Sequence, residues 1–155
     1  MTRQDPSSPP PMASAGSPRA DGPTRPGWWA GRLRVVLRWP AAAFFVAAGV
    51  NHFLRPAFYR QIIPPALPWP ALLVAVSGVC EVAGGIGLLV RPLRRAAGWG
   101  LVALLVAVFP ANVYMAVCPD RISDLHVAPW LLWARLPLQG VLIAWVWFAA
   151  AGRRS

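Results

Sequence analysis

Four long apolar segments constrain this chain more than any other feature of its sequence. They comprise residues 35–54, 71–90, 96–117 and 129–151. Each is close to the ~20 residues with which a helix crosses the ~30 Å hydrocarbon core of a bilayer. None shows the alternating pattern of a β-barrel wall, and helices satisfy their own backbone hydrogen bonds in lipid. The sequence therefore predicts an all-α fold, a bundle of four transmembrane helices.

The composition agrees with a membrane protein. Charged residues make up only 13% of the chain, about half of the ~25% that is usual in soluble domains. All 15 basic residues are arginines and the net charge is +10. A nucleic-acid-binding protein gathers such charge on one accessible face, whereas here the arginines flank the apolar segments. We therefore expect the lipid bilayer, and no nucleic acid, as the chain's partner.

The apolar segments belong to one domain, residues 31–152, which follows an N-terminal arm. Residues 1–30 are rich in Pro, Ser, Gly and Ala, and such a segment buries too little apolar surface to fold. We interpret it as a disordered cytoplasmic arm, although its acid-poor, Arg-containing composition also fits a transit peptide. The first span is the weakest, with 16 uncharged residues between Arg38 and Arg55. Arg38 is expected to extend from its end toward the membrane surface.

The arginines also predict the orientation of the chain. Eleven of them lie in residues 1–38, in the RPLRR loop at 91–95 and in the C-terminal tail, against three in the segments 55–70 and 118–128. By the positive-inside rule, both termini are cytoplasmic. Arginine without lysine, with abundant Ala, Pro and Gly, suggests a GC-rich bacterial genome. We therefore expect a multi-pass protein of a bacterial plasma membrane.

The loop at 55–70, RPAFYRQIIPPALPWP, contains five prolines. Proline restricts its own backbone and discourages helix at the residue before it, so the loop is predicted to be extended and stiff. Its aromatic and isoleucine residues indicate that it lies over the bundle or in the membrane interface.

Strongly polar residues inside the spans are the candidates for function. Glu81 lies ~15 Å from either end of the second span, where a charge costs ~2.5–3.5 kcal/mol. The other candidates lie at or outside the midplane on the same, outer side: Asn51, His52, Asn112, Arg135 and Gln139. This convergence predicts an intramembrane polar site in the outer half of the bilayer.

Helical spacing suggests how Glu81 is accommodated. It lies in a stripe of small residues with Ser77, Gly84 and Gly85, which let helices approach closely. Arg135 is the only basic residue well inside a span. The sequence therefore predicts a Glu81–Arg135 ion pair, or a neutral Glu81 that donates a hydrogen bond to Gln139 or Asn112. Such a pair is either a structural latch between helices or part of a ligand or proton site.

His52 and the cysteines allow narrower conclusions. His52 is either an interfacial or capping residue or a group that exchanges protons near physiological pH, and it could bond a quinone carbonyl. Cys80 and Cys118 are expected to be unrelated apolar fillers. The histidines and cysteines match no metal-ligand spacing, so we expect no metal and no haem.

Several short motifs together resemble those of a known family. They are G-x-x-H-F at Gly49–Phe53, P-P-x-L-P at Pro64–Pro68, S-G-x-x-E at Ser77–Glu81, F-P-A-N at Phe109–Asn112 and R-x-P-x-Q at Arg135–Gln139. With them, residues 35–150 resemble the DoxX-like family of small bacterial membrane proteins. The resemblance implies a four-helix integral membrane protein. The family is named after a small subunit of a membrane thiosulfate:quinone oxidoreductase, and other relatives are linked to oxidative-stress complexes. It identifies no catalytic residue.

Two hypotheses for function follow. In the first, the protein is a quinone-linked, oxidoreductase-associated subunit whose polar residues line a site open toward the outer leaflet. Glu81 or His52 would handle protons, Arg135 would bind an anion or quinol oxygen, and partner subunits would supply the redox centre because the chain has no intrinsic cofactor motif. In the second, it is a non-enzymatic carrier or structural partner with Glu81–Arg135 as a latch. The glycine-rich second span is also compatible with packing against a second copy of the chain, so a homo-oligomer is a further alternative.

Overall fold

A computed structural model describes residues 28–122 and 128–151. Its elements are α1 (Trp28–Leu54), α2 (Pro56–Gln61), α3 (Pro70–Leu89), α4 (Arg94–Val117), the 3-10 turn η1 (Pro119–Arg121) and α5 (Pro129–Ala150). Four of these helices, α1, α3, α4 and α5, are long and apolar enough to cross a membrane. The predicted all-α bundle is confirmed, and by the length and composition of its helices this is a multi-pass membrane protein. Most of the predicted N-terminal arm, residues 1–27, lies outside the described residues.

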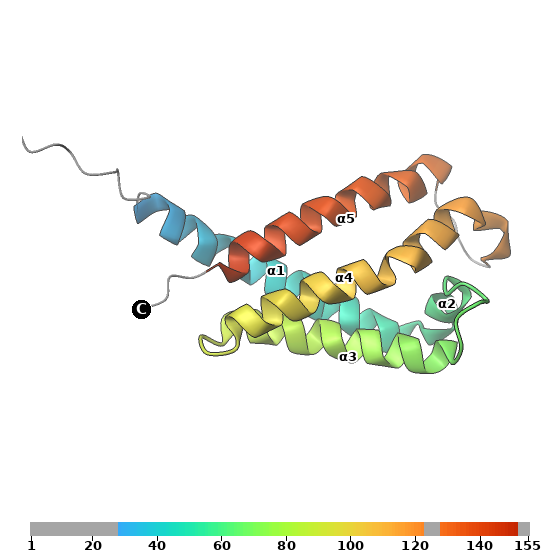
Figure 1. The fold of residues 1–155 in the computed structure, drawn as a ribbon, viewed down its shortest axis with the longest axis horizontal. Coiled ribbons are helices and arrows are strands. Elements are labelled where there is room, and N and C mark those ends of the chain that lie inside the picture. The colour runs from blue at the N-terminus through green and yellow to red at the C-terminus, as the bar shows by residue number, and fades with distance from the viewer. Residues whose placement is uncertain (1–27, 123–127, 152–155) are drawn as a thin grey trace, which may run out of the picture.

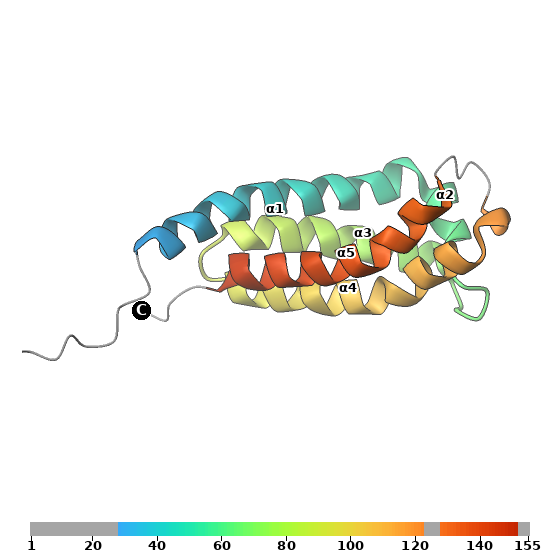
Figure 2. The ribbon, with the colours of Figure 1, turned by 90° about the horizontal axis from the view of Figure 1, so that it is seen from above.

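The four long helices run antiparallel to their neighbours in chain order (Figures 1 and 2). α3 packs against α1 and α4, and α5 packs against α4 and α1. α3 and α5 thus occupy opposite corners of the bundle. At one end, called here the α2 end, lie α2 and η1, and at the other, the α3–α4 end, lies the turn that joins α3 to α4 (Figure 1).

The first helix starts earlier than the sequence predicted. It begins at Trp28 rather than near residue 35, and its first turns project beyond the bundle at the α3–α4 end (Figure 2). The other three long helices agree with the predicted spans to within two residues. The three residues 28–30, assigned to the arm from sequence, therefore belong to α1.

Near the α3–α4 turn, two arginine side chains bind backbone carbonyls in the last turns of helices. Arg38 is buried, and its Nε donates a hydrogen bond to the carbonyl of Ala149 at 3.2 Å. Arg94 Nε likewise donates to the Leu88 carbonyl at 3.1 Å. The last carbonyls of a helix lack backbone partners and carry partial negative charge, so a guanidinium binds them well. Arg38 therefore binds the end of α5, and its extension toward the membrane surface stays a prediction.

The proline-rich loop contains a short helix that the sequence did not predict. α2 begins at Pro56, a position where the missing N–H costs little because the first helical N–H groups have no partner within the helix. The prediction that the segment lies over the bundle is confirmed, because Phe58 and Tyr59 pack against a buried cluster at the α2 end. That cluster consists of Ile62, Met115, Ala116, Ile122 and Leu132.

α1 and α3 approach each other closely, backbone against backbone, at their glycines. A Cβ added to Gly49 would lie 2.6 Å from the Gly78 carbonyl oxygen, and one added to Gly85 would lie 2.9 Å from the Ala42 carbonyl oxygen. Backbones this close leave no room for a side chain. Gly84, in contrast, faces Leu101 of α4. The glycines of α3 thus allow close packing on both of its neighbours.

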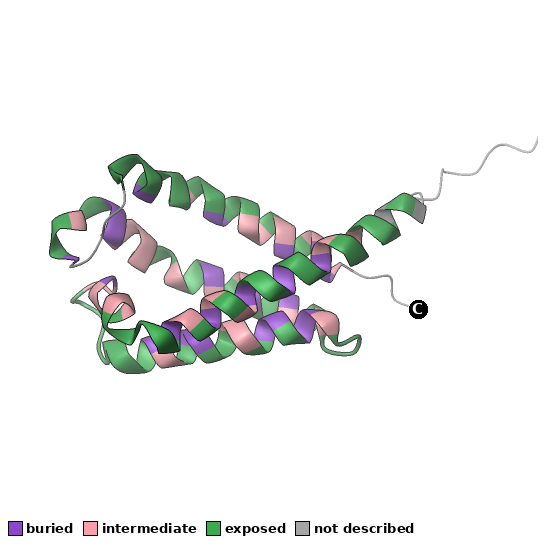
Figure 3. Ribbon diagram, turned by 180° about the vertical axis from the view of Figure 1, so that it is seen from behind, coloured by how far each residue is buried: buried purple, intermediate pink, exposed green. Residues whose placement is uncertain are grey.

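Buried residues line the inside of the bundle and exposed residues cover its outside (Figure 3). The buried core includes Phe45, Leu88, Leu101 and Val146. Much of the exposed surface is also apolar, with large side chains that include Val36, Trp39, Ile86, Val106, Trp133 and Val141. A surface of this kind suits lipid and is rare in a soluble monomer.

We predict that Gly49→Ala lowers the free energy of unfolding by about 1–3 kcal/mol, because the new methyl group forces α1 and α3 apart. Titration of the purified protein with a denaturing detergent in mixed micelles measures the change. Gly140→Ala is the matched control, since a Cβ at Gly140 of α5 meets nothing within 4 Å. Equal stability of the two variants would contradict the packing described here.

Candidate functional site

The structure separates the six candidate residues into two groups and one isolated side chain. Asn51, His52 and Glu81 lie together with Tyr59 between α1, α2 and α3, and these four residues are called the His52 cluster. Asn112 and Gln139 form a second contact, between α4 and α5. Arg135 belongs to neither group. The predicted convergence of all six is therefore only partly realised.

The His52 cluster is centred on an acid–base contact. His52 Nδ1 lies 3.6 Å from Glu81 Oε2 and 3.0 Å from the carbonyl oxygen of Ala48. A carbonyl oxygen only accepts hydrogen bonds, so the bond to Ala48 assigns the proton to Nδ1. In the neutral ring, Nε2 is then the nitrogen that can accept a proton.

Glu81 is a buried acid whose carboxylate is incompletely hydrogen-bonded. Its side chain is 12% exposed, and Oε2 is buried without a hydrogen-bond partner among the described residues. Buried polar atoms almost always have such partners, and ionisable groups inside membrane spans are costly. An acid left in this condition beside a histidine is a candidate for a functional group.

Tyr59 of α2 holds the histidine in place. The two rings stack with centroids 3.8 Å apart and an interplanar angle of 22°. The Tyr59 hydroxyl accepts a hydrogen bond of 2.9 Å from Asn51 Nδ2. Tyr59 was not predicted as a site residue, because the surrounding prolines indicated an extended loop and its ring was interpreted as an interfacial anchor.

His52 lies deeper than its position in α1 suggests. A Cβ added to Gly78 would meet the His52 Cβ at 2.9 Å, so His52 is level with Gly78. Gly78 lies about 12 Å along α3 from Pro70 at ~1.5 Å per residue. His52 is buried as a result, although it is only two residues from the end of α1.

The predicted Glu81–Arg135 ion pair is wrong. Within the described residues, the basic side chain beside the Glu81 carboxylate is His52, at 3.6 Å, and no hydrogen bond joins Glu81 to Gln139 or Asn112. Arg135 is exposed, and its Nη1 donates to the sulfur of Met115 at 3.8 Å. The physical reason is the topology, because α3 and α5 lie on opposite corners of the bundle.

A latch between helices does exist, but other residues form it. Asn112 Nδ2 donates to Gln139 Oε1 at 3.1 Å, and Gln139 Nε2 donates to the carbonyl of Leu105. Gln139 is only 4% exposed. Pro110 interrupts the hydrogen-bond ladder of α4, and in lipid the carbonyls near such a break need side-chain partners. Gln139 therefore fastens α5 to α4 near this break.

The cysteines are both free thiols, with Cys80 exposed and Cys118 half-buried. Among the described residues, no three His, Cys, Asp or Glu side chains are placed to hold a metal ion.

The family follows from a match over most of the chain. Residues 41–150 match the model of a family described as Domain of unknown function (DUF8561). The chain belongs to this family. The match runs from α1 to the end of α5, so the DUF8561 domain includes the His52 cluster and the Asn112–Gln139 latch. Neither a curated protein nor a solved structure matches the chain.

For the latch of this DUF8561 domain, we predict that Gln139→Leu lowers the free energy of unfolding by about 1 kcal/mol, because it removes two hydrogen bonds between helices. A double-mutant cycle with Asn112→Val in mixed micelles should give a coupling energy near ~0.6 kcal/mol. Strict additivity of the two substitutions would show that the side chains do not act together.

Proposed function

We propose that this protein is the membrane subunit of a quinone-linked oxidoreductase in a bacterial plasma membrane, and that its His52 cluster exchanges protons with the quinone. The observation that supports this most directly is the 3.6 Å contact between His52 and Glu81 within membrane-spanning helices. One carboxylate oxygen of that pair has no hydrogen-bond partner among the described residues.

The chemistry of quinones suits such a pair. Reduction of a quinone to a quinol takes up one proton for each electron, and oxidation releases them. An imidazole and a carboxyl group held together are effective general acid and base. His52 Nε2 can accept a proton or a hydrogen bond from a quinol hydroxyl, and Glu81 Oε2 can do the same. A quinone is itself lipophilic, so it can reach the helices from the bilayer.

The electrons must come from another protein. The sequence contains no motif for a redox cofactor, and a partner subunit would supply that centre. The resemblance of residues 35–150 to the DoxX-like family supports this assignment, because the family is named after a subunit of a thiosulfate:quinone oxidoreductase. Arg135 contacts Met115, which belongs to the buried cluster that Tyr59 packs against. Arg135 is thus placed to bind a quinol oxygen or an anion beside this cluster.

A second candidate is a non-enzymatic carrier or structural partner. Its support is that the His52–Glu81 contact joins α1 to α3 close to Gly78, where those helices already pack tightly. In that case the pair fastens two helices and no ligand is involved. The two candidates differ in what happens when Glu81 is replaced in a folded protein.

We predict that Glu81→Gln weakens binding of the reduced quinone, the quinol, by about tenfold or more. The Glu81 carboxylate can accept a hydrogen bond from a quinol hydroxyl, and a hydrogen bond to a charged group contributes ~1.5–3 kcal/mol. The full chain in lipid nanodiscs is titrated with a short-chain quinone kept in its reduced form, and quenching of tryptophan fluorescence reports binding. Asp120→Asn is the matched control, since it removes an exposed acid at the α2 end.

The outcomes separate the two candidates. Weaker quinone binding with an unchanged unfolding midpoint supports the quinone site. A lower unfolding midpoint with unchanged quinone binding supports the structural role. Absence of quinone binding to the wild-type chain contradicts the oxidoreductase assignment.

The orientation proposed with this function places both termini and the α3–α4 turn in the cytoplasm. We predict that, in a Cys80→Ser/Cys118→Ser background, a membrane-impermeant maleimide labels Ala66→Cys in intact cells but not Pro92→Cys. Both positions are exposed turn residues at opposite ends of the bundle. Labelling of Pro92→Cys alone would reverse the assignment.

A further inference from the structure

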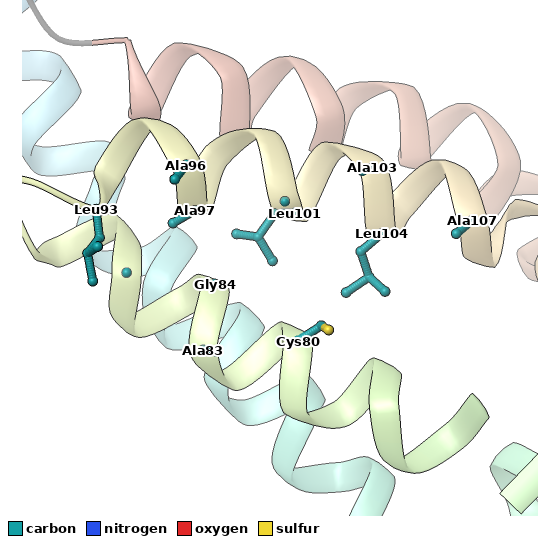
Figure 4. Close-up of a pocket in the computed structure, with 12 residues that line it drawn as sticks. Cys80, Ala83, Gly84, Leu93, Ala96, Ala97, Leu101, Ala103, Leu104 and Ala107 are labelled. Atoms are coloured by element: carbon teal, nitrogen blue, oxygen red, sulfur yellow. The ribbon is translucent and has the colours of Figure 1, made fainter. Parts of the chain in front are cut away.

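An apolar groove runs between α3 and α4 on the outside of the bundle (Figure 4). Its volume is about 530 Å³, within the ~300–1,000 Å³ of typical ligand sites. The two helices are close near Leu93 and diverge toward Cys80 and Ala107 (Figure 4). Small residues, among them Ala83, Gly84, Gly100 and Ala103, form much of the lining. The groove is separate from the His52 cluster, none of whose residues lines it.

The groove lies toward the α3–α4 end of the bundle. It extends from Leu93 to Ala107 of α4, about 21 Å at ~1.5 Å per residue. On α3 it ends at Cys80, midway between Pro70 and Leu89. A single leaflet contributes ~15 Å of the ~30 Å hydrocarbon core. The groove is therefore long enough to hold an acyl chain that crosses one leaflet from the surface at the α3–α4 end.

The end of the groove near Leu93, at the α3–α4 turn, is positively charged. Arg91, Arg94 and Arg95 stand in the turn and first residues of α4 around Leu93. Arg94 is engaged with the Leu88 carbonyl, whereas Arg91 is exposed on the turn itself. The two acids of the described residues, Glu81 and Asp120, lie at mid-bundle and at the α2 end. No described carboxylate therefore offsets this charge at the membrane surface.

The charge distinguishes a lipid from a second copy of the chain. Two copies in one membrane share the same orientation, so a dimer packed through this groove would bring both sets of arginines to the same level. Like charges at an interface oppose association. An anionic headgroup instead neutralises the arginines while its acyl chain fills the groove, and basic residues at a membrane surface attract such lipids.

We propose that this face is a binding site for one anionic phospholipid. One acyl chain lies in the groove between α3 and α4, and the phosphate group is bound by Arg91. The site depends only on the α3–α4 turn lying at a membrane surface and is independent of the quinone assignment.

The test is native mass spectrometry of the full chain, purified in detergent and incubated with equal amounts of phosphatidylglycerol and phosphatidylcholine. The wild type should retain phosphatidylglycerol in preference. Arg91→Gln should reduce that preference about fivefold, since each arginine near the surface contributes ~1 kcal/mol. Arg60→Gln, an exposed arginine at the α2 end, should leave it unchanged.

A second variant, in which a larger side chain fills the groove, tests whether an acyl chain lies there. Gly100→Leu should reduce the retention of both lipids, because a side chain there enters the groove. Gly140→Leu is the matched control, since an added Cβ meets nothing within 4 Å at either glycine and Gly140 is not a groove residue. Circular dichroism checks that each variant is helical, and if Gly100→Leu does not fold, Arg91→Gln decides alone.

Three results would overturn the proposal. They are equal retention of the two lipids by the wild type, an unchanged preference in Arg91→Gln, and unchanged lipid retention in a folded Gly100→Leu. A wild-type dimer that Gly100→Leu converts to monomer would assign the groove to a second copy instead.

Discussion

The bundle depends on the close approach of α1 and α3 at their glycines. Lipid removes most of the hydrophobic force between helices, so close packing and interhelical hydrogen bonds must hold them together. At Gly49 and Gly78 the two backbones touch. This contact sets His52 beside α3, one turn from Glu81. The acid–base pair is therefore a consequence of glycine packing, and loss of that packing would separate the pair without changing either polar residue.

The polar groups of the bundle have different roles. Gln139 and Asn112 satisfy each other and a backbone carbonyl of α4 near Pro110, and Arg38 and Arg94 satisfy carbonyls at helix ends. These contacts complete the backbone hydrogen bonding that lipid cannot provide. The His52 cluster is different, because Glu81 keeps an unsatisfied oxygen. Among the described residues, Arg34 Nε is the other buried side-chain atom without a hydrogen-bond partner, but Glu81 alone combines this condition with a titratable neighbour.

Several features of the site could be predicted from the sequence. The predictions that were wrong have a common cause. Glu81 was identified from its cost in an apolar segment, and His52 and Gln139 because both lie at or outside the midplane on the same side. Depth depends only on residue count along a helix, but pairing depends on which helices are neighbours. Arg135 was chosen as the partner of Glu81 because it is the only basic residue well inside a span, yet its helix lies diagonally opposite. Tyr59 was missed because α2 forms where prolines indicated extended chain.

The sequence by itself determined the all-α class, the number of membrane-crossing helices and the position of Glu81 midway along the second of them. Those properties depend on hydrophobic length and on the fixed rise of a helix. Only the tertiary structure decided which polar residues meet, because neighbours around a bundle are set by contacts between distant segments. It also showed that Arg38 caps α5 and that a groove opens between α3 and α4. Both depend on helix spacing, which the glycines and bulky side chains of two helices determine together.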